Sequence, residues 1–529
     1  MSWLKKHNHW LLIAAGTIIW SATMIKSGLI YDFGMGFWGP NGHDGIWHVA
    51  LINSLSRGSF EMPIFAGAQI KNYHLGFDIL LAVIHFLTRI SVINLYFQII
   101  PPVLAFLIGW LTYKLTKNLW VIFFVYFGGS LGWVLGKGES TFWSQQAIST
   151  LINPPFALSL VLLLLLLLLL KKERYILAAL VVALLPQVKI YAGLLAFFGL
   201  IAAGIKNKKI FLTLIIGLLI YLPSNYQLLT NNSKLLVWNP GWFLQTLFAP
   251  DRLNWPRLFS ALTTYSQKTL SFKSLLAYLF AFAVFWVGNM GSRLFKEILI
   301  FKWVKNVREI TWLDSFYAAI IIAGGIIPMF FLQTGTAWNT IQFFYYSLFF
   351  SSILAGLALS EVLKIKKLNN YLRFGICVFV IAGTLLTTWD TLTKVYLPSR
   401  PPAKISPGEL QALNYLKKLP SGVVLTYPGS SDPYASPPRP LYLYESTAYV
   451  SAISGQPTYL SDEVNLNITN YPWQDRRLRE LSFFNRPSVQ FLTQNQIKYI
   501  YLLNQQIPTS GFPANKIFSN SEVVIYSVN

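Results

Sequence analysis

The chain has 529 residues, of which 54% are hydrophobic and only 12% are charged, and its mean hydropathy is +0.49. A soluble domain of this size cannot bury so much apolar surface, so the composition excludes an ordinary soluble enzyme. The formal net charge of +22 resembles that of a nucleic-acid-binding protein, but the Lys and Arg residues gather in short runs between apolar segments. Such placement follows the positive-inside rule and predicts a membrane protein with no nucleic-acid partner.

Apolar segments in chain order predict about eleven transmembrane helices. The first covers residues 10–30, and we expect it to be retained because it is long and has no small-x-small cleavage site. The others are expected near 92–113, 118–136, 154–170, 175–187, 189–205, 210–228, 272–292, 314–332, 341–362 and 372–390. The stretch 75–90 is apolar but short, and we interpret it as a helix in the outer face of the membrane. The alternative, a true span, would place Lys171 to Arg174 outside.

Basic runs serve as cytoplasmic markers for the topology. They are Lys5-Lys6, Lys114 to Lys117, Lys171 to Arg174, Lys206 to Lys209, Arg293 to Arg308 and Lys364 to Lys367. With all of them inside, the N-terminus is cytoplasmic and the C-terminus lies outside the cell membrane. This topology predicts a membrane domain over residues 1–390 with three outer loops, 31–91, 137–153 and 229–271.

From residue 391 onward the composition changes, beginning with a proline-rich linker. An amphipathic helix is expected over 409–419, a strand over 422–427, a helix–strand step over 491–503 and a final strand over 523–528. Alternating short helices and strands predict a small soluble extracytoplasmic α/β domain over residues 391–529. The single cysteine, Cys377, lies in the last apolar span, so this domain folds without a disulfide framework.

Titratable residues concentrate in and beside the outer loops. They include Asp32, Asp44, Glu61, Asp78, Glu139, Asp251 and four of the six histidines, His43, His48, His74 and His85. The densest stretch runs from Gly39 to His48 and opens an amphipathic surface helix. Asp44 and His48 are four residues apart and share a helix face, where a carboxylate can orient an imidazole. Asp44 as a helix N-cap is the structural alternative.

The histidines also raise the question of a metal site. His43, His48 and His74 form the alternative ligand set for a divalent metal, but no tight spacing such as His-Glu-x-x-His occurs. The sequence therefore predicts no metal and no other cofactor.

Several features of the first outer loop carry a family resemblance. Asp44 precedes a surface helix after the first span, Gly58 and Pro63 follow it, and Tyr73-His74-Leu75-Gly76 opens a second apolar helix. This layout resembles the GT-C class of membrane glycosyltransferases, which includes protein O-mannosyltransferases and aminoarabinose transferases. The resemblance implies a polytopic helical fold, a polyprenyl-phosphate sugar donor and Asp44 as catalytic base.

The same resemblance assigns further residues. Glu139 occupies the place of a second acidic residue in the next outer loop, and Lys189 lies at the turn of two short paired helices, where it would face the carrier's phosphate. Arg252 and Arg257 are candidate additional phosphate contacts or headgroup anchors, and Gln342 is a candidate cavity residue. His43 stands where some members have a second acid.

The expected partners are the lipid-linked donor, membrane lipids, and a glycan, lipid or protein acceptor. Two other readings stay open. One is a transporter or flippase of lipid-linked glycans, which would carry ionisable residues along a path near the bilayer midplane. The other is a non-catalytic relative in which the outer domain binds a glycan or a partner.

Overall fold

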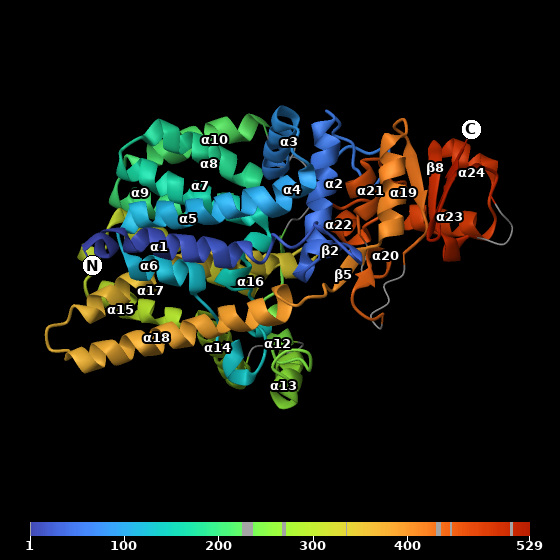
Figure 1. Ribbon diagram of the computed structural model, residues 1–529. Coiled ribbons are helices and arrows are strands. Elements are labelled where there is room, and N and C mark those ends of the chain that lie inside the picture. Colours follow the sequence, from blue (N-terminus) through green and yellow to red (C-terminus); the bar gives the residue numbers. More distant parts are fainter. Residues whose placement is uncertain are drawn as a thin grey trace. The chain divides into compact units, whose positions relative to one another are not determined.

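The computed structural model describes residues 2–224, 236–266, 271–334, 336–429, 435–444, 447–507 and 512–528. The chain divides into two compact units (Figure 1). The helical unit contains Met1–Ala22 and Pro102–Leu397, and the mixed unit contains Thr23–Pro101 and Pro398–Asn529.

The helical unit is built mainly from apolar helices. They are α1 (Ser2–Ser21), α5 (Ile100–Thr116), α6 (Leu119–Phe127), α7 (Pro154–Lys171), α8 (Tyr175–Val188), α9 (Ile190–Lys206), α10 (Ile210–Ser224), α12 (Trp242–Thr246), α13 (Pro256–Ser266), α14 (Phe272–Met290), α15 (Lys296–Lys305), α16 (Trp312–Phe330), α17 (Gln342–Leu363) and α18 (Asn370–Thr391). Strands β3 (Leu236–Trp238) and β4 (Phe331–Gln333) form a small antiparallel pair.

Among the described helices, six segments are long and apolar enough to cross a membrane. They are Val92–Thr116, Pro154–Lys171, Phe272–Lys305, Trp312–Phe330, Ala337–Val362 and Asn370–Tyr396. Shorter apolar helices of 10–17 residues accompany them: Gly76–Thr88, Tyr175–Val188, Ile190–Lys206 and Ile210–Leu222. The predicted class, a polytopic helical membrane protein, is confirmed, and the total of eleven spans stays a prediction.

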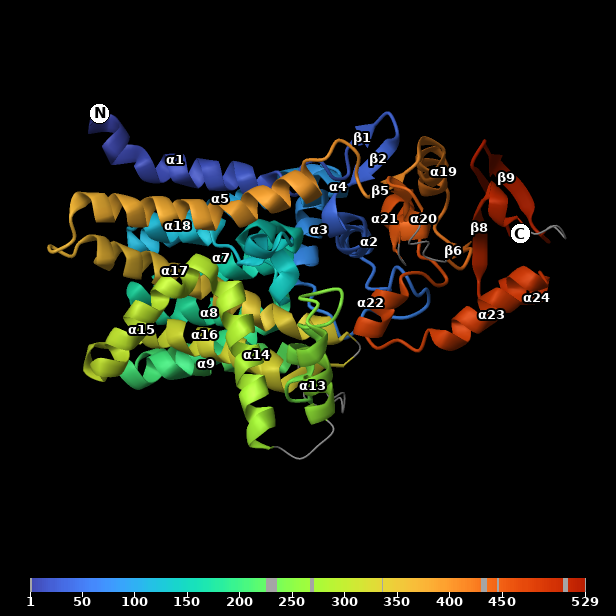
Figure 2. The same cartoon turned by 90° about the horizontal axis from the view of Figure 1, so that it is seen from below.

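Helix α17 lies at the centre of the helical unit. It packs against α6 and α16, and α16 in turn packs along α9 (Figure 2). In the span that contains α17, 83% of the most apolar window is buried, against 22% in the span that contains α18. The α18 span therefore leaves most of its apolar side chains for lipid, whereas α17 is covered by protein.

The prediction of a span over 118–136 is wrong. Helix α6 has 9 residues, which extend about 13 Å, less than half of the roughly 30 Å that a spanning helix needs. It ends at Gly128, whose carbonyl accepts a 2.6 Å hydrogen bond from Nη2 of the buried Arg293. A Cβ on Gly128 would lie 2.5 Å from Arg293 Nε, so the close approach requires glycine.

The mixed unit has two four-stranded sheets. The first has the order β1 (Ile30–Tyr31), β2 (Gly34–Phe37), β5 (Ala403–Ile405) and β7 (Arg439–Pro440). The second has the order β6 (Val423–Thr426), β8 (Ile497–Leu503), β10 (Val523–Ser527) and β9 (Asn515–Ser519). In the second sheet β6 and β8 are parallel, and the other neighbours are antiparallel.

Helices surround these sheets. They are α2 (Asp44–Ser56), α3 (Gly76–Thr88), α4 (Val92–Asn94), α19 (Pro407–Lys418), α20 (Leu441–Tyr444), α21 (Tyr449–Ser454), α22 (Glu463–Ile468), α23 (Gln474–Asn485) and α24 (Val489–Gln494). The helix expected over 409–419 is α19, and the expected strands are β6, β8 and β10. The short α/β elements predicted after residue 391 are thus confirmed. A capping box between Ser406 and Glu409 starts α19.

Segments far apart in the sequence form this unit together. Strand β2 pairs with β5 in the register Met35↔Ile405, and helix α2 packs against α21 (Figure 1). At the start of β2, a Cβ on Gly34 would lie 2.1 Å from the Ile405 carbonyl oxygen, and its φ of +107° also favours glycine. The first outer loop therefore folds with the C-terminal region, whereas the predicted membrane–water boundary near residue 390 stays a prediction.

Candidate active site

Asp44 lies at the first position of α2, directly after a turn made by Gly39 to Gly42. The N-cap is His43, and no side-chain hydrogen bond caps the helix, so the alternative that Asp44 serves as the N-cap is wrong. The Asp44 carboxylate is half exposed, at 49% of its side chain, and its Oδ1 lies 3.0 Å from His43 Nδ1. Asp44 therefore offers a reachable carboxylate on an otherwise buried helix.

His43 joins Asp44 to a second carboxylate from the C-terminal region. Its Nε2 lies 3.5 Å from Asp462 Oδ1, and the Asp462 side chain is completely buried. Burial alone would lower the pKa of His43, but the carboxylates of Asp462 and Asp44 outweigh it and raise the pKa to about 11. At neutral pH the imidazole is therefore a cation that bridges two carboxylates.

His48 contacts a different carboxylate from the one that the spacing predicted. Its Nδ1 lies 2.7 Å from Oδ1 of Asp78 on α3, and both side chains are buried. The prediction that Asp44 orients His48 is wrong, because α2 turns this face towards α3, where Asp78 is the nearer acid. Tyr73 Oη lies 3.4 Å from His48 Nε2, and its ring stacks on His74 with centroids 4.6 Å apart.

The metal-ligand set that the sequence offered as an alternative does not come together. His43 contacts Asp44 and Asp462, whereas His48 contacts Asp78 and Tyr73. Within the described ranges, no group of three or more His, Cys, Asp or Glu side chains is arranged to hold a metal ion.

Glu139 lies in the helical unit, in a 3-10 turn (Glu139–Phe142). Its carboxylate accepts a 3.2 Å hydrogen bond from the Gln146 backbone N–H and a short one from the Ser149 hydroxyl. Burial raises the pKa of Glu139 to about 7, and these two donors and the charge of Arg293 limit the rise. Glu139 is thus a partly buried acid whose pKa lies well above that of a free carboxyl group.

The remaining predicted residues of the helical unit are Lys189, Arg252, Arg257 and Gln342, and Arg252 contacts the turn that holds Glu139. Lys189 separates α8 from α9, as the paired-helix pattern predicted, and its buried Nζ lies 3.4 Å from Asn153 Oδ1. Arg252 donates to the Ser140 carbonyl and stacks over the Trp143 ring at 4.3 Å. Arg257 is exposed on α13, and Gln342 donates to Asn339 Oδ1 at the start of α17.

The sequence did not predict two contacts at this site, that of Asp462 with His43 and that of Asp78 with His48. Asp462 precedes α22 with a φ of +54°, an unusual value for a residue other than glycine. Its distance in sequence from His43 hides the contact. Asp78 carried a usable signal, because an acid in an apolar segment needs a partner when it is buried.

Comparison with known proteins finds similar structures but no similar sequences. No family model and no curated protein matches the chain. The oligosaccharyltransferase of Archaeoglobus fulgidus, tethered to an acceptor peptide, superposes with a TM-score of 0.52 and 12% identity, over 95% of this chain and 70% of that one. The arabinofuranosyltransferase AftD from Mycobacteria superposes with a TM-score of 0.52 and 11% identity, over 99% of this chain and 40% of that one.

Both neighbours have the GT-C fold. This chain has the GT-C fold. The resemblance inferred from the first outer loop is therefore confirmed at the level of the fold. The chain spans well under half the length of AftD and about two thirds of the oligosaccharyltransferase, and identities this low carry no further conclusion about activity.

Proposed function

We propose that the protein is a membrane glycosyltransferase that moves a sugar from a polyprenyl-phosphate carrier to an acceptor hydroxyl at the outer face of the membrane. The observation that supports this proposal best is Asp44, a half-exposed carboxylate fixed at the start of a buried helix in a GT-C fold. Both structural neighbours are named as glycosyltransferases, one for oligosaccharide and one for arabinofuranose.

Asp44 is proposed as the general base. Transfer requires a group that takes the proton of the acceptor hydroxyl as the new glycosidic bond forms, and a carboxylate within hydrogen-bonding reach can do so. A single direct displacement of the carrier phosphate would invert the anomeric centre. The His43 imidazole lies 3.0 Å from Asp44 and holds its carboxylate in place.

The leaving phosphate requires positive charge or N–H donors. We propose Lys189 for this role, because its ammonium is held at a break between two helices and cations bind phosphate oxygens well. Glu139, which the resemblance offers as a second catalytic acid, is proposed as a supporting residue that exchanges a proton near neutral pH. Arg252 and Arg257 stay candidates for contacts to the carrier or to headgroups.

The test is transfer of radiolabel from a panel of polyprenyl-phosphate sugars by purified protein. We expect wild type and the exposed control Asp32→Asn to transfer label, and Asp44→Asn to lose at least 99% of the rate while retaining its Tm. Full activity of a correctly folded Asp44→Asn variant would contradict the assignment of the base.

A transporter of lipid-linked glycans is the rival function. If reconstituted protein moved labelled carrier lipid across the bilayer and transferred none of its sugar, the rival would replace the enzyme. A third possibility is a non-catalytic relative. It would be favoured by the absence of both transfer and flipping.

A further inference from the structure

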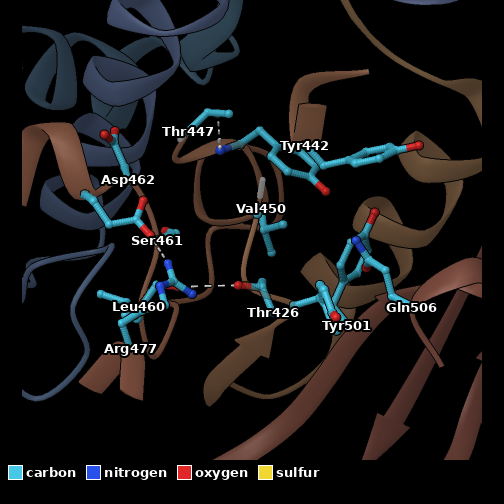
Figure 3. Close-up of a pocket in the computed structure, with 14 residues that line it drawn as sticks. Thr426, Tyr442, Thr447, Val450, Leu460, Ser461, Asp462, Arg477, Tyr501 and Gln506 are labelled. Atoms are coloured by element: carbon cyan, nitrogen blue, oxygen red, sulfur yellow. Dashed lines mark hydrogen bonds and ion pairs between the residues drawn. The ribbon is translucent and has the colours of Figure 1, made fainter. Parts of the chain in front are cut away.

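A cavity of about 60 Å3 lies within the mixed unit, at the carboxyl ends of the two parallel strands of the second sheet (Figure 3). Thr426 is the last residue of β6 and pairs with Tyr501 on β8, and both line the cavity. Gln506, just after β8, lines it as well. In sheets with parallel strands, ligands bind in the crevice beyond the carboxyl ends of the strands. The cavity thus occupies the end of the parallel pair at which such crevices form.

The wall of the cavity is aromatic on one side and polar on the other. Tyr442, Tyr501 and Gln506 lie on one side of the cavity and Ser461 on the other, and the Asp462 carboxylate is turned away from it (Figure 3). The wall thus combines aromatic faces, hydroxyl groups and an amide. The volume has room for roughly four water molecules, the scale of one small polar unit.

The charges that line the cavity are paired with charges of opposite sign. Arg477 lies between Glu463 and Glu480 and forms an ion pair with each. Burial raises the pKa of Glu480 to about 8 in spite of Arg477. The three side chains Arg477, Glu463 and Glu480 together therefore carry little net charge at neutral pH. Asp462 faces the His43 cation. Among the described residues that line the cavity, a charged ligand would therefore find its counter-charges already paired, and this wall favours an uncharged ligand rich in hydroxyl groups.

One wall of the cavity is linked directly to the proposed base. Asp462 lines the cavity and contacts His43 Nε2, while His43 Nδ1 contacts Asp44. The Asp462 side chain is completely buried, so a ligand in the cavity would lie beside this residue and not bind its carboxylate directly.

We propose that this cavity is a subsite for an uncharged sugar unit of the acceptor, held by the Tyr442 ring and by hydroxyl and amide side chains. The proposal rests on the proposed function in one respect, namely that the bound sugar belongs to the acceptor. Binding of a sugar in the cavity does not depend on transfer. The cavity therefore selects a glycan as the acceptor, and a peptide acceptor would overturn the proposal.

Binding is measured on the full chain in lipid nanodiscs by saturation-transfer NMR, with methyl glycosides of neutral hexoses and pentoses as probes. A capped tripeptide and a sugar acid serve as comparison probes. The variants are Tyr442→Ala, Tyr442→Phe and Gln506→Ala. The control is Tyr371→Ala, a tyrosine on α18 that is 90% exposed.

We expect at least one neutral glycoside to bind and neither comparison probe to do so. Tyr442→Ala should raise its Kd by roughly tenfold, which corresponds to about 1.4 kcal/mol, because it removes the aromatic face against which the sugar packs. Tyr442→Phe and Tyr371→Ala should leave Kd within twofold. If Tyr442→Ala fails to fold, Gln506→Ala must weaken binding at least threefold.

The outcomes separate the two proposals. Asp44→Asn that binds glycoside normally but transfers no label would support both. Glycoside binding without transfer from any donor in wild type would keep the subsite and remove the transferase. Absence of glycoside binding, unchanged binding in both Tyr442→Ala and Gln506→Ala, or binding of the tripeptide instead would overturn the subsite, whatever the transfer assay shows.

Discussion

The buried contact between His48 and Asp78 yields a prediction that can be worked out from the structure. Their side chains are 4% and 0% exposed, and Nδ1 lies 2.7 Å from Oδ1. Asp78→Ala leaves a buried imidazole without this carboxylate. Hydrogen bonds to charged groups contribute about 1.5–3 kcal/mol, and leaving a buried polar group without its partner costs about 1–3 kcal/mol. We therefore expect a loss of about 3 kcal/mol.

In units of roughly 150–250 residues, 1 kcal/mol shifts Tm by about 2–4 °C, so Asp78→Ala should lower Tm by about 6–12 °C. Asp78→Asn keeps an oxygen that can accept from Nδ1–H and should lose about a third as much. Thermal unfolding is followed by tryptophan fluorescence, to which Trp47 contributes from its place beside Tyr73. Asp32→Ala, at an exposed position, is the matched control.

A double-mutant cycle then isolates the pair. If the contact stabilises the fold, adding His48→Ala to Asp78→Ala should cost at least 1 kcal/mol less than His48→Ala alone. A Tm for Asp78→Ala within 2 °C of the Asp32→Ala control, together with additive single variants, would refute the reasoning.

Two further predictions concern buried charges. Since burial raises the pKa of Glu480 from 4.5 to about 8, the folded chain holds an extra proton between these values and loses stability as pH rises through them. Glu480→Gln, which imitates the protonated acid, should leave Tm unchanged at pH 5 and raise it by several degrees at pH 8.5; an equal effect at both pH values would contradict this. Arg293 donates to Gly128, Gln146 and Ser352, and Arg293→Lys, with one ammonium in place of a planar fork, should lower Tm by at least 5 °C; an unchanged Tm would show that these bonds add nothing.

The sequence predicts what depends on local pattern. The apolar periodicity that places α7, α14, α16 and α17, and the capping box that begins α19, are features of adjacent residues. Hydropathy failed over 118–136 because it counts apolar residues and does not register the Gly128 break. At that break the Gly128 carbonyl accepts a hydrogen bond from Arg293, which lies far away in the sequence.

In the candidate site, too, local features were predictable from the sequence and contacts between distant segments were not. Asp44 was predicted at the start of a helix because glycines and a proline precede it, and α2 begins there. The partner of His48 was missed because helical spacing compares only residues of one helix, whereas Asp78 lies on α3. Asp462 could not be predicted from spacing, since nothing in the first loop specifies which C-terminal residue will pack against it.

The contact of Asp462 with His43 bears on how the two parts of the mixed unit act together. If the C-terminal region only bound a partner, its residues would have no reason to reach the start of α2. Instead its buried carboxylate lies 3.5 Å from the imidazole whose other nitrogen contacts Asp44. The buried Asp462 carboxylate and the half-exposed Asp44 carboxylate thus share one imidazole. The C-terminal region therefore sets the electrostatics of the proposed base, and a chain without it would lose more than an acceptor-binding surface.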